Sequence, residues 1–249
     1  MTELLGQLPG VVATHEPEPG FHEVMRPAQT DPLIFVEFWK KKLTVIGATG
    51  SDVYVETSNV FSKGFLPTLL RMGIKPKLIF LNRSPRKIAL SLLSRKSIPG
   101  VSSSGLKYSA SPNDPMTLPL SESSWTNYQR CYWAAIDMLY KQFMIKAMFE
   151  DTLEGIFELT TKQITDFATF SALVQFICPK DHPAKKIDQN ELAQIHTRTV
   201  ATLHNPNPVS LSERNVENID HQEAELLHFI NFYFPTPSHS QLHRQYEAD

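Results

Sequence analysis

The stretch from Arg83 to Arg95 contains the side chains of this sequence that are best suited to bind a phosphate group. Arg83 follows a short apolar run, 78–81, and Ser84 with the proline after it has the composition of a helix start. Ser91 and Arg95 follow at spacings that allow both side chains to lie on one side of that helix. Guanidinium groups and a hydroxyl near a helix N-terminus suit a phosphate monoester, because arginine makes bidentate, charge-assisted hydrogen bonds. The alternative interpretation is an amphipathic helix with a solvated basic face.

The elements that must position these residues alternate between strand and helix. Strands are expected at 11–13, 52–59, 78–81 and 155–160, and the apolar run 78–81 is expected to be buried on both faces. Helices are expected at 32–47, 61–72, 85–96, 124–149, 161–178, 188–204 and 220–234. Strands alternating with helices imply right-handed parallel crossovers, so the sequence predicts an α/β fold.

Three helix starts are predicted from capping residues. Thr161 is expected to cap the helix that runs to Cys178. Capping boxes are expected at Asp188-x-x-Glu191 and at Asp220-x-x-Glu223. The basic run 40–42 lies on the helix expected at 32–47, and its predicted role is a solvated helix face. The alternative role is electrostatic steering of an anionic donor.

The pattern Arg83-x-x-Arg86, followed by Ser91 and Arg95, resembles the 3′-phosphate-binding signature of sulfotransferases that use 3′-phosphoadenosine-5′-phosphosulfate (PAPS). In that family, the arginine at the strand end and the serine eight residues later hold the 3′-phosphate. The resemblance implies that Arg83, Ser91 and Arg95 bind PAPS as the co-substrate, without a metal. Relatives often return a basic C-terminal loop to the nucleotide, and Arg214 is the candidate for that role here.

The same resemblance implies a three-layer, P-loop-type α/β fold with a mostly parallel sheet. We expect a single domain over 1–234 and a disordered polar tail over 235–249. The chain contains no Gly-rich phosphate loop. The resemblance therefore leads us to expect that the family's first strand and its phosphosulfate loop would precede Met1, and that the sheet lacks an interior strand.

The strand expected at 11–13 leads into His15-Glu16-Pro17, at the sheet edge where Arg83 is also expected. This turn resembles the loop in which related tyrosylprotein and trehalose enzymes carry a glutamate that acts as the base. The resemblance therefore favours Glu16 as the group that accepts the proton of the acceptor hydroxyl. His15 is the alternative base, because the pKa of an unperturbed histidine is about 6.5. A further alternative is that Glu16 and Pro17 form only a solvated turn.

Composition narrows the class of protein and its partners. Lys plus Arg number 24 against 26 Asp plus Glu, so the chain has no overall basic field of the kind that binds nucleic acid. Cys131 and Cys178, the only cysteines, lie in apolar helical surroundings, which favours buried thiols, a reducing compartment and a cytoplasmic location. No apolar run reaches the roughly 18 residues that a membrane span requires.

The predicted function is sulfuryl transfer from PAPS to a hydroxyl of a small molecule, carbohydrate, lipid or protein tyrosine. One alternative is a catalytically inactive relative that binds the 3′-phosphoadenosine nucleotide or a partner without turnover. A nucleotide-dependent kinase is disfavoured, because the sequence has no Gly-x-x-x-x-Gly-Lys-[Ser/Thr] pattern. The oligomeric state does not follow from the sequence.

Overall fold

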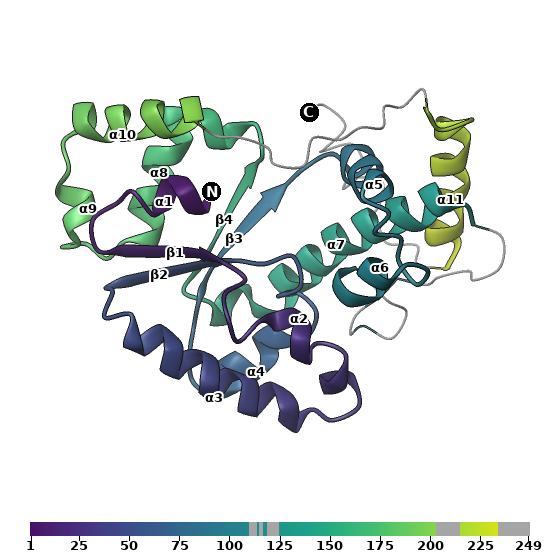
Figure 1. Ribbon diagram of the computed structural model, residues 1–249, viewed down its shortest axis with the longest axis horizontal. Coiled ribbons are helices and arrows are strands. Elements are labelled where there is room, and N and C mark those ends of the chain that lie inside the picture. The colour runs from purple at the N-terminus through teal and green to yellow at the C-terminus, as the bar shows by residue number, and fades with distance from the viewer. Residues whose placement is uncertain (110–113, 115–116, 119–124, 203–214, 234–249) are drawn as a thin grey trace. The chain divides into compact units, whose positions relative to one another are not determined.

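The computed structural model describes residues 1–109, 114, 117–118, 125–202 and 215–233 (Figure 1). The chain divides into two compact units. Unit 1 comprises Met1–Phe61, Phe65–Leu81 and Asp151–Pro206, and unit 2 comprises Ser62–Gly64, Asn82–Glu150 and Asn207–Asp249. The single domain expected over 1–234 stays a prediction, and the expected tail, 235–249, lies outside the described residues.

Unit 1 is a mixture of strands and helices, as the sequence predicted. In chain order its elements are α1 (Thr2–Leu5), β1 (Val11–His15), α2 (Phe21–Val24), η1 (Pro27–Gln29), α3 (Leu33–Ala48), β2 (Val53–Thr57), α4 (Phe65–Arg71), β3 (Lys77–Asn82, ending at the unit boundary), η2 (Glu150–Thr152, beginning at it), β4 (Gly155–Thr160), η3 (Gln163–Thr165), α8 (Phe167–Ile177), α9 (Pro183–Lys186) and α10 (Gln189–Thr202).

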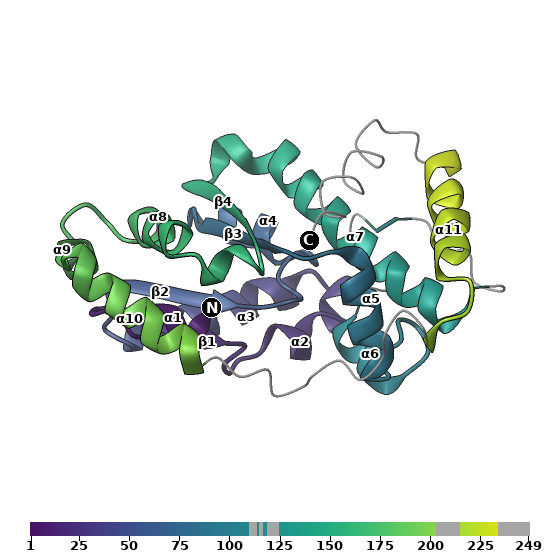
Figure 2. The same ribbon diagram turned by 90° about the horizontal axis from the view of Figure 1, so that it is seen from above.

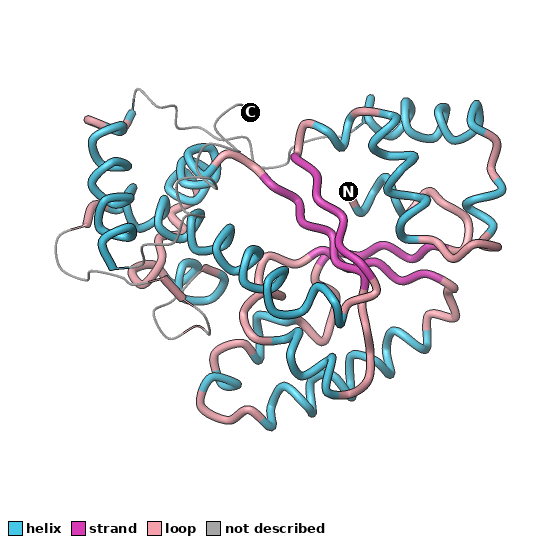
Figure 3. The backbone as a smooth tube through the Cα atoms, turned by 180° about the vertical axis from the view of Figure 1, so that it is seen from behind, coloured by secondary structure: helices cyan, strands magenta, loops and turns pink. Residues whose placement is uncertain are grey.

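The described strands form two small sheets. β1 and β2 are parallel, in a register that runs from Val11 opposite Val53 to His15 opposite Thr57. β3 pairs with β4, and Figure 3 shows each pair of strands lying side by side. The expectation of a mixed α/β fold is therefore confirmed, whereas the larger P-loop-type sheet stays a prediction.

The expectation that the strand at 78–81 is buried on both faces is wrong. Along β3, Leu78 and Phe80 are buried, but Leu81 is 40% exposed. Because side chains of a strand alternate between its faces, one face of β3 packs into the protein while the other is only partly covered.

Two apolar clusters hold unit 1 together. An aliphatic cluster joins Leu4 and Leu5 of α1 to Val11, to Val53 and to helices α8 and α10, and Figure 2 shows α10 beside α1. The second cluster is aromatic, and its rings come from α2, α3, α4 and the segment before α4: Phe21, Phe35, Phe38, Trp39, Phe61 and Phe65. The Trp39 indole N–H donates to the carbonyl oxygen of Phe65 at 2.9 Å, which fixes the rotation of α3 about its axis.

Unit 2 is helical in its described part. Its elements are α5 (Pro85–Ser94), α6 (Ser103–Tyr108), α7 (Asn127–Phe149) and α11 (Ile219–Tyr233). α5 and α11 both contact α7, whose first turn is closed by a capping box between Thr126 and Gln129. Cys131 on α7 and Cys178 in unit 1 are free, buried thiols, as expected, and burial raises the pKa of Cys131 to about 12.

The structure corrects two of the predicted helix starts. α8 begins at Phe167, and its cap is Asp166, whose side chain accepts from the N–H of Thr169, rather than Thr161. The expected box at Asp220 does not form through Glu223, because the carboxylate of Glu223 accepts from Arg86 on α5 instead. The box at 188–191 is only half confirmed, since Asp188 accepts from two N–H groups of the first turn of α10.

We expect Arg86→Ala to lower the free energy of unfolding by about 2–3 kcal/mol, because the substitution leaves a buried carboxylate without its charged partner. Arg86 binds Glu223 through Nε at 2.9 Å and through Nη2 at 2.7 Å, and Tyr128 also contacts Glu223. Urea-induced unfolding measures the change. The matched control is Lys87→Ala at the next, exposed position of α5, which should change stability by less than about 0.5 kcal/mol. Equal losses in the two variants would contradict this role of Arg86.

Candidate functional site

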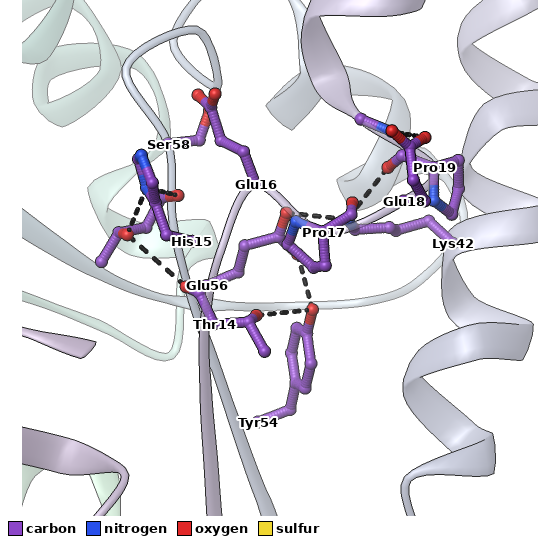
Figure 4. A network of polar contacts seen from close by, with 12 residues as sticks. Thr14, His15, Glu16, Pro17, Glu18, Pro19, Lys42, Tyr54, Glu56 and Ser58 are labelled. Atoms are coloured by element: carbon purple, nitrogen blue, oxygen red, sulfur yellow. Dashed lines mark hydrogen bonds and ion pairs between the residues drawn. The ribbon is translucent and has the colours of Figure 1, made fainter. Parts of the chain in front are cut away.

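Polar side chains gather where β1 and β2 end in unit 1 (Figure 4). His15 is the last residue of β1, and Thr57 is the last residue of β2. Because the two strands are parallel and in register, the segments that follow them leave the sheet at the same edge. Such an edge is where parallel α/β sheets commonly hold their ligands.

Glu16 is fixed to the end of β2 by both its backbone and its side chain. Its φ of 44° lies in the left-handed region, which is uncommon for a residue with a side chain and often marks a functional position. Its N–H donates to Thr57 O at 3.2 Å. Its Oε1 accepts from the Ser58 hydroxyl at 2.8 Å and from the Asn59 N–H at 3.2 Å. Among the described residues, Oε2 has no hydrogen-bond partner and is the oxygen that can still accept a proton.

His15 is exposed and is oriented by Thr57. Its Nδ1 lies 3.1 Å from the carbonyl oxygen of Thr57 and 2.9 Å from the Thr57 hydroxyl. In the neutral tautomer that donates Nδ1–H to the carbonyl oxygen of Thr57, Nε2 carries the lone pair. Both sequence-predicted base candidates, His15 and Glu16, therefore lie together at this edge and present an atom that can accept a proton.

Four further polar residues connect β1, β2 and α3 behind these two. Lys42 Nζ donates to Glu56 Oε1 at 2.7 Å, and the Tyr54 hydroxyl donates to Glu56 Oε2 at 2.8 Å. The Thr14 hydroxyl in turn donates to Tyr54 Oη at 3.1 Å. Burial raises the pKa of the Glu56 carboxyl, although Lys42 and Tyr54 oppose the shift. Burial also raises the pKa of Tyr54 to about 12, so this hydroxyl is a neutral donor near pH 7.

The prediction that the basic run 40–42 is a solvated face holds for Lys40 and Lys41 and is wrong for Lys42. Lys40 and Lys41 are exposed, but Lys42 is 0% exposed. Its burial could have been found from periodicity, because Phe35, Phe38 and Lys42 follow one another at three- and four-residue steps on the apolar face of the helix. A lysine on an apolar stripe was the available signal.

The predicted phosphate-binding residues lie on and before α5 in unit 2. Arg95 donates from Nη2 to Ser91 Oγ at 2.9 Å and from Nε to Ser91 O at 3.1 Å, so the structure brings these two residues together. Ser91 is buried and Arg95 is exposed. Ser84 precedes the helix but makes no side-chain cap. Among the described residues, the Arg83 guanidinium, which is partly exposed, forms no hydrogen bond or ion pair.

The predicted site residues fall in different parts of the chain. His15 and Glu16 belong to unit 1, whereas Arg83, Ser91 and Arg95 belong to unit 2. Arg214 lies outside the described residues.

The described residues contain neither a metal-binding cluster nor a membrane-spanning helix. In the part of the chain that the structure describes, no group of three or more His, Cys, Asp or Glu side chains is placed to hold a metal ion. Within the same ranges, no helix combines the length and the apolar character that crossing a bilayer requires.

Comparison with known proteins gave no relative. No protein-family model matches this chain, and searches of curated proteins and of solved structures found no similar protein. Functional inference therefore depends on the residues and the geometry of the chain itself.

Proposed function

We propose that this protein is a sulfotransferase that moves a sulfuryl group from PAPS to a hydroxyl acceptor. The observation that carries the proposal is the arrangement at α5. Among the described residues, the partly exposed guanidinium of Arg83 has no partner, and it precedes Ser84, the N-cap of α5. The bonded pair of Ser91 and Arg95 lies in the last turn and at the C-cap of the same helix. A cation without a protein partner, beside a helix N-terminus, is suited to a dianionic phosphate. In this role the three side chains position the donor and take no part in the bond changes.

The proposal includes the P-loop-type fold, in which both strand pairs belong to one mostly parallel sheet. The shared core of unit 1 supports this fold. Leu159 of β4 belongs to the same apolar cluster as Val11 of β1 and Val53 of β2, and Ile79 of β3 packs against that cluster. The parallel register of β1 and β2 is also the one that such a sheet requires.

In the proposed reaction, the acceptor oxygen attacks the sulfur of PAPS in line. A new S–O bond forms, the bond from sulfur to the 5′-phosphate oxygen breaks, and adenosine 3′,5′-bisphosphate leaves. Glu16 accepts the proton of the acceptor hydroxyl on Oε2, the oxygen that Ser58 and Asn59 leave open. The acceptor classes are a small alcohol, a carbohydrate, a lipid or a protein tyrosine.

A second candidate function is nucleotide binding without turnover. It is favoured by the two hydrogen bonds that Glu16 Oε1 accepts from Ser58 and Asn59, because they also suit a carboxylate that only closes the loop after β2. A protein that binds adenosine 3′,5′-bisphosphate and transfers no sulfuryl group to any acceptor class would fit this second function.

Arg83→Ala is expected to weaken the binding of adenosine 3′,5′-bisphosphate by about 2–4 kcal/mol, because a bidentate contact to the 3′-phosphate is lost. Ser91→Ala should cost about 1 kcal/mol, the value of one neutral hydrogen bond. Titration calorimetry of the full chain measures both affinities.

The matched control for Arg83 is Arg71→Ala, which removes an exposed arginine at the end of α4 in unit 1 and should leave the affinity unchanged. If Arg83→Ala binds the nucleotide as tightly as the wild-type protein does, α5 does not hold the 3′-phosphate. Absence of any binding by the wild-type protein would contradict both candidate functions.

A further inference from the structure

Lys42 has a completely buried ammonium group whose three N–H bonds all have acceptors. Nζ donates to Pro17 O at 2.8 Å, to Pro19 O at 3.0 Å and to Glu56 Oε1 at 2.7 Å. An ammonium has three donors, so these contacts use its full capacity. The ring of Phe21 lies 5.0 Å from Nζ and adds a cation–π contact. Figure 4 shows the lysine reaching from α3 to the segment that follows Glu16.

The segment that Lys42 binds has few backbone donors of its own. Pro17 and Pro19 have no N–H, so neither residue can tie this segment to the end of β2 through its own nitrogen. Their carbonyl oxygens face a buried cation instead. Glu16, the residue just before them, holds a left-handed φ of 44°, and such a conformation persists only where surrounding contacts fix it.

Charge neutralisation alone does not account for this arrangement. A buried ammonium needs an opposite charge, which Glu56 supplies at 2.7 Å. The bonds to Pro17 and Pro19 are additional and join α3 to the loop after β1. With the bond to Glu56 near the end of β2, Lys42 connects three separate segments. The loop is thereby fixed on both sides of Glu18.

We propose that Lys42 is a positioning residue for Glu16. It holds the carbonyl groups that follow Glu16, and it thereby keeps the Glu16 carboxylate on the Ser58 hydroxyl and the Asn59 N–H. In this proposal, Lys42 itself contacts neither PAPS nor the hydroxyl substrate. The inference rests on the proposed role of Glu16 as the base, but its structural content can be tested without an assay of activity.

The pH dependence of the Asn59 amide resonance tests the proposal. Because this N–H donates to Glu16, its chemical shift should follow the ionisation of the Glu16 carboxyl in the wild-type protein. Lys42→Met with Glu56→Gln, which removes the cation without leaving a buried unpaired carboxylate, should abolish this titration. Glu56→Gln alone keeps the carbonyl bonds and should retain it, as should the control Lys41→Met. A variant that is less stable but still folded would keep the pH dependence of the Asn59 amide resonance, so loss of stability alone does not explain its disappearance.

Two outcomes would overturn the proposal. If the double variant keeps the Asn59 titration, Lys42 does not position Glu16. If Glu56→Gln alone abolishes the titration, Glu56 is the positioning residue and Lys42 only neutralises it.

A measurement on the unmodified protein covers the case in which the double variant does not fold. Acylation of the native protein with an amine-reactive reagent should label Lys40 and Lys41, which are exposed, and leave Lys42 unlabelled. Labelling of Lys42 at the rate of Lys41 would show that its ammonium is not held by the loop, and would contradict the proposal.

Sulfation assays separate the failure of this inference from the failure of the proposed function. In an active protein, the double variant should lower kcat while the affinity for adenosine 3′,5′-bisphosphate stays at its wild-type value. If the wild-type protein sulfates no acceptor but shows the expected titrations, positioning by Lys42 stands and the proposed reaction is wrong. If sulfation occurs and the double variant is as active as the wild type, Lys42 has no positioning role.

Discussion

Replacement of Lys141 by methionine is expected to lower the free energy of unfolding by about 3–5 kcal/mol near pH 7. The Lys141 ammonium is completely buried in unit 2 beside two carboxylates that are equally buried. It pairs with Asp137 one turn earlier on α7, lies 3.9 Å from Asp114, and donates to the Thr117 hydroxyl at 3.3 Å. Without the ammonium, the buried Asp137 carboxylate loses its charged partner, which is the costly way to break a buried ion pair.

The loss should depend on pH. Burial raises the pKa of Asp137, and Lys141 opposes the shift. In the variant this opposition is gone, so the pKa of Asp137 in the folded state rises further above its value in the unfolded chain. The folded variant therefore binds more protons than its unfolded chain over the window between these two pKa values, and its stability falls as pH rises through that window. Urea unfolding should show a smaller loss near about pH 4 than near pH 7.

Two further variants separate the effect of the buried charge on stability from other effects of the Lys141→Met substitution. Lys146→Met makes the same change at an exposed position of the same helix and should alter stability by less than about 0.5 kcal/mol. Lys141→Met combined with Asp137→Asn also removes the charge of the carboxylate that Lys141 binds, and should recover part of the loss. If Lys141→Met is no more destabilising than Lys146→Met, the cluster has no role in stability.

The elements that the sequence predicted best are those determined by short-range chemistry. The strand expected at 155–160 is observed over the same residues, and the helix after Ser84 begins at Pro85 because proline has no N–H to lose at that position. The contact between Ser91 and Arg95 is also local, since residues four apart meet on a helix.

Three of the predictions that failed depend on contacts between residues far apart in the sequence. Buried Lys42 donates to the carbonyl oxygen of Pro17, a residue 25 positions away along the chain. Glu223 does not form the expected capping box because it binds Arg86, a residue 137 positions away. The exposure of Leu81 depends on which segments cover β3, and the apolar composition of the strand does not contain that information.

The candidate site was predicted only in part, because some of its contacts also join residues that are far apart in the sequence. A polar turn after an apolar strand placed His15 and Glu16 at a sheet edge, and the parallel pairing of β1 with β2 supplied their partners Thr57 and Ser58. The left-handed backbone of Glu16 and the bonds from Lys42 to Pro17 and Pro19 had no local signal. Tertiary contacts between α3, β2 and the loop determine both.

Glu16→Gln is expected to lower kcat for sulfuryl transfer by roughly 10²–10⁴-fold, the usual contribution of a general base. The amide can still accept the hydrogen bonds of Ser58 and Asn59 on its oxygen, so the loop should keep its conformation. What is lost is the negatively charged oxygen that takes the proton. The affinity for adenosine 3′,5′-bisphosphate should stay unchanged, because the proposed nucleotide-binding residues lie on and before α5.

Initial rates with PAPS and each acceptor class measure this effect, and the neighbouring residues supply the controls. Glu18→Gln makes the same chemical change two residues away, at a carboxylate that accepts from the Gly20 N–H, and should leave kcat near its wild-type value. His15→Asn should cost much less than Glu16→Gln if Glu16 is the base. Among the described residues, Nε2 of His15 forms no hydrogen bond, because the ring contacts Thr57 through Nδ1, and Nε2 is available to accept a proton. A dead His15→Asn variant beside an active Glu16→Gln variant would therefore assign proton transfer to the imidazole and leave Glu16 as the residue that closes the loop after β2.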